Sequence, residues 1–178
     1  RRPLHREFIH AMRRHPFRFA MADQTRPRVT SLQALIGSIV LARVLRPHWE
    51  SQRHVGILLP PTVAGALVNV AAPLCGKTSV NLNYTVGKSG LEAAVRLAGL
   101  RTVVTSRVFV EKAKLELPDG PSIVWLEDVA RTIGTGQKLA ASLLALCAPA
   151  RLIERTCGQD TPLTMDDLAT IIFSSGST

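Results

Sequence analysis

The stretch HVGILLPPTVAGALVNVAAPL (residues 54–74) decides the fold, because it joins a short apolar strand directly to an apolar helix. Apolar length and turn residues predict the strand over 55–59 and the helix over 63–74. A strand without a polar face is typical of one that is covered on both sides. The stretch therefore indicates a parallel sheet packed between helices.

The same alternation of strand and helix continues in both directions from this stretch. Thr30 and Gln33 have the spacing of a capping box, which predicts a helix that begins there and ends before Pro47. Further strands are predicted over 19–22, 80–82, 102–105, 123–126 and 169–173, further helices over 4–12, 91–98 and 137–147, and loops over 118–122 and 155–162. The predicted fold class is α/β, with a mostly parallel sheet flanked by helices.

Composition excludes several classes of protein. The chain has 178 residues, 46% of them apolar, which is enough for a buried core. Its longest nearly unbroken apolar run, 63–75, is shorter than the ~20 residues of a membrane span. Three cysteines without paired spacing predict neither a disulfide framework nor a zinc site. The formal charge of +9 comes almost wholly from residues 1–54, which hold eleven arginines against three acidic residues.

The end of the chain carries the clearest chemical signal. An apolar strand ends at Phe173 and runs into five small residues: Ser174, Ser175, Gly176, Ser177 and Thr178. Glycine permits positive φ, so successive backbone N–H groups can turn toward one anion, and the hydroxyls add donors. The segment is therefore a candidate phosphate-binding loop; a solvated turn after a strand is the alternative.

This strand and loop resemble the phosphate-loop motif of the adenylate-forming (AMP-binding) superfamily, in which glycine and a Pro-Lys-Gly run normally follow. The resemblance extends upstream through the early helix, the strand of residues 54–60, and residues 74–85, where Asn81 replaces a customary proline. Residues 83–85 and 105–112 are most similar to the bacterial acyl-acyl carrier protein synthetase / 2-acylglycerophosphoethanolamine acyltransferase group. Order and spacing of the motifs carry the resemblance.

The resemblance implies that residues 1–178 are the first part of the large N-terminal domain of such an enzyme, truncated inside the phosphate loop. It implies an AMP-forming ligase that uses ATP and Mg²⁺ to adenylate a fatty or other carboxylic acid. The acyl group then passes to a pantetheine thiol of acyl carrier protein or CoA. The metal-binding Glu, the ribose-binding Asp and the catalytic Lys are expected beyond residue 178, so we expect no catalytic or metal-binding residue within the chain, and no activity from it alone.

Location and partners follow from the same resemblance. The expected location is the cytoplasm, with peripheral contact at the cytoplasmic face of the inner membrane. No nucleic-acid partner is expected, because Trp49, Tyr84 and Trp125 are scattered rather than interleaved with a basic stripe. An acyltransferase domain often precedes this group of enzymes, and a basic leading helix over 1–16 fits such a junction.

A second hypothesis assigns the basic leading helix to binding. Residues 1–16 form an amphipathic helix that either docks on the domain or adsorbs to an anionic membrane surface or partner through Arg6, Arg13 and Arg14. A third option keeps adenylation but changes the acid to an amino, aryl or short-chain one.

Two patterns are interpreted as structural. Gly76-Lys77-Thr78 resembles the end of a Walker A loop but follows a helix, so Lys77 is predicted to be a turn residue before a strand. The histidines at 5, 10 and 15 rotate around a helix and are not expected to bind a metal.

Overall fold

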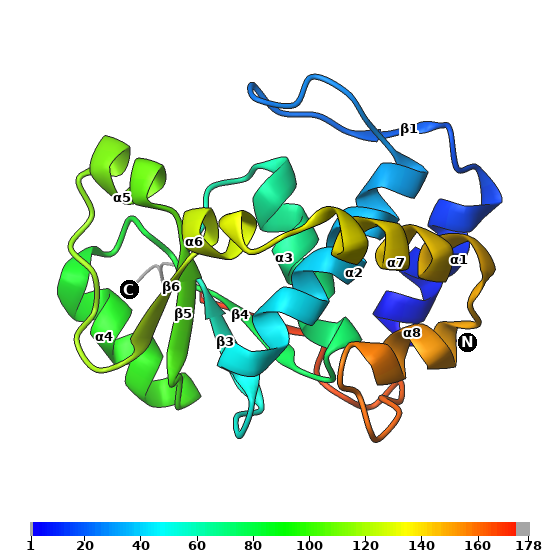
Figure 1. Ribbon diagram of the computed structural model, residues 1–178. Helices are drawn as coiled ribbons and strands as arrows, with labels where there is room; N and C mark the ends of the chain where they lie inside the picture. The colour runs from blue at the N-terminus through cyan, green and yellow to red at the C-terminus, as the bar shows by residue number, and fades with distance from the viewer. Residues whose placement is uncertain (1, 174–178) are drawn as a thin grey trace.

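The computed structural model describes residues 2–173. Within them, five parallel strands form one sheet in the order β6-β5-β3-β4-β7 (Figure 1). The strands are β3 (His54–Ile57), β4 (Thr78–Asn81), β5 (Thr102–Thr105), β6 (Ser122–Trp125) and β7 (Thr170–Ile172). The predicted α/β class with a parallel sheet is confirmed.

Helices cover both faces of this sheet. One face packs against α2 (Ser31–Leu45) and α3 (Val63–Leu74), with α7 (Thr135–Cys147) packed on α2, and the other face packs against α4 (Gly87–Ala98) and α5 (Arg107–Ala113) (Figure 1). Each face has its own buried cluster, with Leu35, Val55 and Val68 in the first and Leu58, Val80 and Val103 in the second. Neighbouring positions of one strand therefore point to opposite cores, which explains why the strands have no polar face.

The helix α2 begins as the sequence predicts. The Thr30 hydroxyl accepts a hydrogen bond from the backbone N–H of Gln33, and the Gln33 side chain accepts one from the N–H of Thr30. The helix contacts α1, α3 and α7 and is buried along most of its length. It is followed by the 3₁₀ helix η1 (Arg46–Trp49), whose Trp49 is fully buried.

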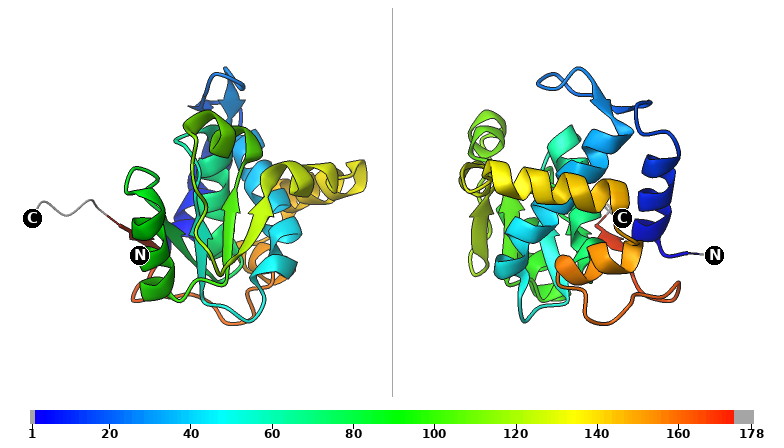
Figure 2. Two further views of the ribbon diagram at one scale, coloured as in Figure 1. Left: turned by 90° about the vertical axis from the view of Figure 1, so that its left-hand side faces the viewer. Right: turned by 45° about the vertical axis from the view of Figure 1, so that its right-hand side comes forward.

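The leading helix α1 (Leu4–Arg14) docks on the domain. It contacts α2, α3 and α7, and Figure 2 shows it standing beside the end of α7 and near α8 (Ala150–Thr156). Its apolar side buries Ile9. Docking is thus the outcome for residues 4–14, and none of the described helices is long and apolar enough to cross a bilayer.

Sequence reasoning missed several short elements. A two-residue strand, β2 (Val29–Thr30), pairs antiparallel with β1 (Phe19–Met21) ahead of α2. Three helices were not predicted: α5, α6 (Leu126–Arg131) and α8. Leu126 begins α6 rather than ending a strand, and Arg155 lies in α8 rather than in a loop. These helices have seven residues or fewer, too few for apolar periodicity to reveal them.

Candidate functional site at the carboxyl edge of the sheet

The loops after β3, β4 and β5 leave the sheet at one edge, because parallel strands end on the same side. Strand β7 ends there too, since Ile172 lies opposite Asn81, the last residue of β4. Phe173 then packs against the cluster around Leu58 and Leu82. The candidate loop Ser174, Ser175, Gly176, Ser177 and Thr178 starts from this edge, but the loop itself lies outside the described residues.

The turn from β3 into α3 is tightly built. The Thr62 hydroxyl accepts a hydrogen bond from the N–H of Gly65 at the start of the helix. A Cβ on Gly65 would stand 2.7 Å from the backbone oxygen of Pro60, so the turn excludes any side chain there. This rigid turn borders a cavity of about 460 Å³, which is also lined by β3, α3 and Asn81.

Asp23 joins this turn from the loop after β1. Its carboxylate accepts a hydrogen bond from the backbone N–H of Val63 at 2.8 Å and further bonds from Thr25 and Arg26. Hydrogen bonds from the Thr25 hydroxyl and the Val63 N–H lower the pKa of Asp23 to about 2. An ionised carboxylate at the start of α3 interacts favourably with the helix dipole.

An amide pair connects α3, β4 and β7. Asn69 Nδ2 donates to Asn81 Oδ1 at 3.0 Å, and Asn81 Nδ2 donates back to Asn69 Oδ1 at 2.8 Å. Asn81 Nδ2 also lies 3.1 Å from the Thr170 hydroxyl on β7. Asn81 stands where the family resemblance leads one to expect proline, and here its side chain supports the strand that leads to residue 174.

On the other side of β3, the end of β5 is held by polar contacts. The Ser106 hydroxyl accepts from the N–H of Phe109, beginning α5, and donates to Glu127 Oε1 at 2.7 Å. Burial raises the pKa of Glu127, but the bonds from Ser106 and from backbone N–H groups outweigh it and leave the pKa lowered. The resemblance singled out Thr105-Ser106-Arg107 and Tyr84, and the structure brings them to the same edge, with the rings of Tyr84 and Phe109 5.3 Å apart.

Arg107 is fixed rather than free at this edge. It forms two bonds with the Asp128 carboxylate, at 2.7 and 2.8 Å, and its guanidinium lies 4.8 Å from the centre of the Trp125 ring. The ion pair raises the pKa of Arg107. The residue therefore shapes the edge instead of serving as a mobile cation.

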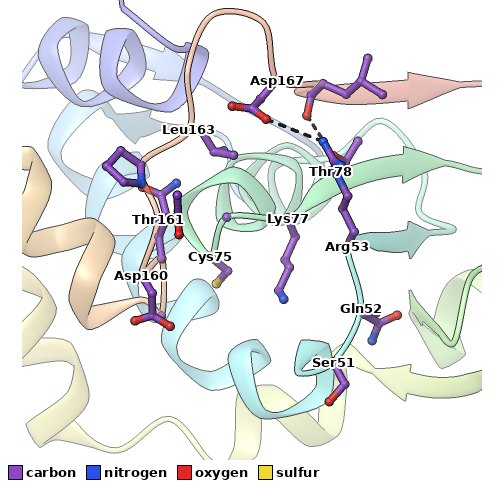
Figure 3. A pocket seen from close by; sticks show the side chains of 15 residues that line it. Ser51, Gln52, Arg53, Cys75, Lys77, Thr78, Asp160, Thr161, Leu163 and Asp167 are labelled. Atoms are coloured by element: carbon purple, nitrogen blue, oxygen red, sulfur yellow. Dashed lines mark hydrogen bonds and ion pairs between the residues drawn. The ribbon is translucent and has the colours of Figure 1, made fainter.

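A second cavity, of about 620 Å³, lies at the opposite, amino end of β3, β4 and β7 (Figure 3). Its wall includes Lys77, whose side chain extends into the open space, and Arg53, which lies 3.7 Å from Asp167. Lys77 sits between α3 and β4, in the turn predicted for it. The order helix, turn, strand is the reverse of the order in a Walker A loop, and the prediction that Lys77 is a turn residue before a strand is confirmed.

The described part of the edge supplies binding groups rather than reactive ones. The polar side chains that line the 460 Å³ cavity are Thr62, Asn69 and Asn81, which carry hydroxyl and amide groups without charge. Among residues 2–173, no three His, Cys, Asp or Glu side chains gather closely enough to hold a metal ion.

Comparison with known families identifies the chain. The family model of the AMP-binding enzyme matches residues 8–178, which include the whole candidate loop. The chain belongs to the AMP-binding enzyme family.

Solved structures show that this member of the AMP-binding enzyme family has the fold of the corresponding part of adenylate-forming enzymes. NpsA of Klebsiella oxytoca, in complex with 3-hydroxyanthranilyl-AMSN, is 17% identical with a TM-score of 0.70, over 96% of this chain and 30% of that one. VinN is 18% identical with a TM-score of 0.71, over 98% and 42%. The O-succinylbenzoate CoA synthetase MenE of Bacillus subtilis, in complex with AMP, is 16% identical with a TM-score of 0.69, over 96% and 39%. The chain thus spans less than half the length of each.

Two supporting residues of this edge escaped sequence reasoning. Asp23 and Val63 are forty positions apart, and Asn69 lies inside an apolar helix pattern. The one signal for Asn69 in the sequence was a polar residue within the apolar segment 63–75, because an amide that is partly buried there needs a hydrogen-bond partner.

Proposed function

We propose that the chain forms the phosphate-binding side of an ATP-dependent, AMP-forming acid–thiol ligase. The supporting observation is that the family match runs through Thr178 while β7, which precedes that segment in the chain, ends at the carboxyl edge of the sheet. In open α/β sheets this edge is where ligands bind. The hydroxyls of Ser174, Ser175, Ser177 and Thr178 and the backbone at Gly176 are proposed to donate hydrogen bonds to the polyphosphate of ATP.

Residues that fix β7 would position this loop. The Thr78 hydroxyl donates to the backbone oxygen of Leu168 at 2.9 Å, and the Thr170 hydroxyl donates to that of Ser79 at 3.2 Å. Together with Asn81, these bonds hold the outermost strand on β4. A loop carried by a fixed strand needs less ordering when the nucleotide binds, which favours its use in orienting the phosphates.

The proposed reaction activates a carboxylic acid. The carboxylate attacks the α-phosphorus of ATP, forming an acyl-adenylate and releasing pyrophosphate, and a pantetheine thiol then takes the acyl group and releases AMP. Bound Mg²⁺ would neutralise charge on the phosphates. The share of this chain is to donate hydrogen bonds to the phosphate oxygens as their charge shifts toward the leaving group.

The finer proposal is a fatty acid, with acyl carrier protein or CoA as acceptor. It rests on the motif resemblance of residues 83–85 and 105–112. The solved neighbours do not add to it, since their titles name a 3-hydroxyanthranilyl ligand for NpsA and O-succinylbenzoate for MenE. The acid-dependent exchange of pyrophosphate into ATP separates these classes when the complete protein is offered medium-chain and long-chain fatty acids, aryl acids and amino acids.

The proposed role of the loop can be tested with alanine variants. Ser174→Ala and Ser177→Ala each remove one hydroxyl that is proposed to donate to a phosphate, so exchange by the complete protein should fall by about tenfold or more. Ser142→Ala is the matched control, because the Ser142 hydroxyl bonds only to the Lys138 oxygen within α7. Unchanged exchange in both loop variants would remove the phosphate-binding role, whereas exchange that depends on aryl but not fatty acids would remove only the finer proposal.

A further inference from the structure

Arginines surround a cavity of about 360 Å³ between α1 and the start of α8. It is lined by Arg2, Arg6, Ile9, His10, Arg13, Ala150 and Arg151. None of these described lining residues is acidic. The cavity shares no lining residue with the one at the carboxyl edge. Its position and its charge therefore set it apart from the proposed ATP site.

A buried carboxylate holds two of these arginines. Glu154 is fully buried and lies on α8. Its oxygens accept from Arg6 Nε, from Arg6 Nη2 at 2.8 Å and from Arg151 Nη1 at 3.3 Å, and one lies 3.0 Å from His5 Nε2. Arg151 also donates to the backbone oxygens of Gln159 and Asp160. Both guanidiniums are thereby fixed, while their side chains remain about 30% exposed.

Arg13 is held by the last turn of α7. Its Nε donates to the Ala145 oxygen at 2.7 Å, and its Nη2 donates to the oxygens of Leu144 at 2.8 Å and Ala148 at 2.6 Å. The Leu144 oxygen also accepts the backbone N–H of Ala148, whereas carbonyls at the end of a helix otherwise lack a partner inside it. The contact caps α7 and places a third guanidinium at the cavity in a single orientation.

Each of the three fixed arginines keeps one nitrogen unused. Within residues 2–173, no hydrogen bond involves Arg6 Nη1, Arg13 Nη1 or Arg151 Nε. The charge is also unbalanced, since the four arginines at the cavity contact only two carboxylates, those of Glu7 and Glu154. An excess of two positive charges and three donors on different side chains match a doubly charged, tetrahedral anion.

We propose that this arginine cavity binds a phosphate group, carried either by a small soluble ligand or by the headgroup of an anionic lipid. The volume accommodates a phosphate monoester with a small substituent. Arg6, Arg13 and Arg151 are ordered before the ligand arrives, so these three side chains lose little entropy on binding. Part of the basic segment, residues 1–54, would thus bind a phosphate group, and this binding would not require adenylation.

The test uses this chain with inorganic phosphate as the probe, followed by calorimetry or by chemical-shift changes. Arg151→Lys keeps the charge next to Glu154 but removes the free Nε donor, so phosphate binding should weaken by about fivefold or more, as expected for one charge-assisted hydrogen bond. Arg2→Gln and Arg14→Gln form a matched pair. Both remove one exposed arginine from the same segment, but only Arg2 lines the cavity. Arg2→Gln should weaken binding and Arg14→Gln should leave it within twofold.

Circular dichroism and thermal unfolding show whether each variant is folded. If Arg151→Lys does not fold, the comparison of Arg2→Gln with Arg14→Gln decides the outcome. The proposal is overturned if phosphate does not bind in a saturable manner, or if Arg14→Gln weakens binding as much as Arg2→Gln, because a general charge effect then explains it. Co-sedimentation with phosphatidic acid vesicles, compared with phosphatidylcholine vesicles, identifies the source. Binding to phosphatidic acid vesicles that is weakened by the same variants supports a lipid headgroup as the ligand. Binding of inorganic phosphate without binding to these vesicles supports a soluble ligand.

Discussion

Replacing Asn81 by alanine should loosen the strand that leads to the candidate phosphate loop. The change removes two bonds with Asn69, at 2.8 and 3.0 Å, and one with the Thr170 hydroxyl at 3.1 Å. A typical net contribution of about 1 kcal/mol each would give about 3 kcal/mol. Asn81 and Asn69 are only partly buried, so water can form some of the lost hydrogen bonds. We therefore expect the free energy of unfolding to fall by about 1–2 kcal/mol.

Such a loss corresponds to a fall of about 2–8 °C in Tm for a chain of this size. Hydrogen exchange at residues 168–173 should accelerate more than exchange in β3, since the removed contact holds β7 at the edge of the sheet. Asn83→Ala is the control, because Asn83 bonds only to Thr85, two residues away. If Asn81→Ala lowers stability no more than Asn83→Ala and leaves the exchange of β7 unchanged, the amide pair does not support the strand.

Two further variants test the packing of the domain. Gly65→Ala places a Cβ 2.7 Å from the Pro60 oxygen and should lower the free energy of unfolding in urea by about 1–3 kcal/mol. Gly136→Ala is the control, because its Cβ would meet no atom within 4 Å, and it should leave stability unchanged or raise it. Equal effects of the two variants would contradict the close packing of the turn at Gly65. Burial raises the pKa of Glu154, but bonds from arginine and His5 outweigh it and leave the pKa lowered, so its contribution is present at neutral pH and is lost as pH falls through the folded-state pKa. Glu154→Gln should therefore lower Tm at pH 7, and the difference in Tm between the variant and the wild type should become smaller in acid. A difference in Tm that grows toward low pH would show that the pKa of Glu154 is not lowered by folding.

The alternation of strands and helices could be predicted from the sequence because each segment carries its own signal. The helix over 63–74 and the strand over 102–105 have the predicted bounds. The capping box at Thr30 is also present, since all of its atoms lie within four residues of the chain. Local chemistry of this kind needs no knowledge of the partner surface.

Contacts between distant segments could not be predicted. Arg6 was considered as a membrane-binding residue, yet it pairs with Glu154, 148 positions away, and Arg13 bonds to carbonyls of α7. Nothing near these arginines in the sequence distinguishes them from the exposed Arg14. Membrane contact therefore stays a prediction, and two of the three residues that motivated it already have partners inside the domain. The burial of His5 could not be predicted either, because its partner Glu154 lies far away in the sequence.

The attachment of α1 has a practical consequence for the integrity of the protein. Residues 15–18 connect it to β1 and include the exposed His15 and Arg18, and a protease can cut this linker once the hydrogen bonds from Leu32 and Ser31 to its Pro16 and Arg18 carbonyls open. A cut there would leave the helix pinned by the Glu154 contacts and by its buried Ile9. The nicked protein would migrate as two pieces on a denaturing gel but elute as one particle in native buffer, and a synthetic peptide of residues 2–14 could complement a chain that begins after the cut.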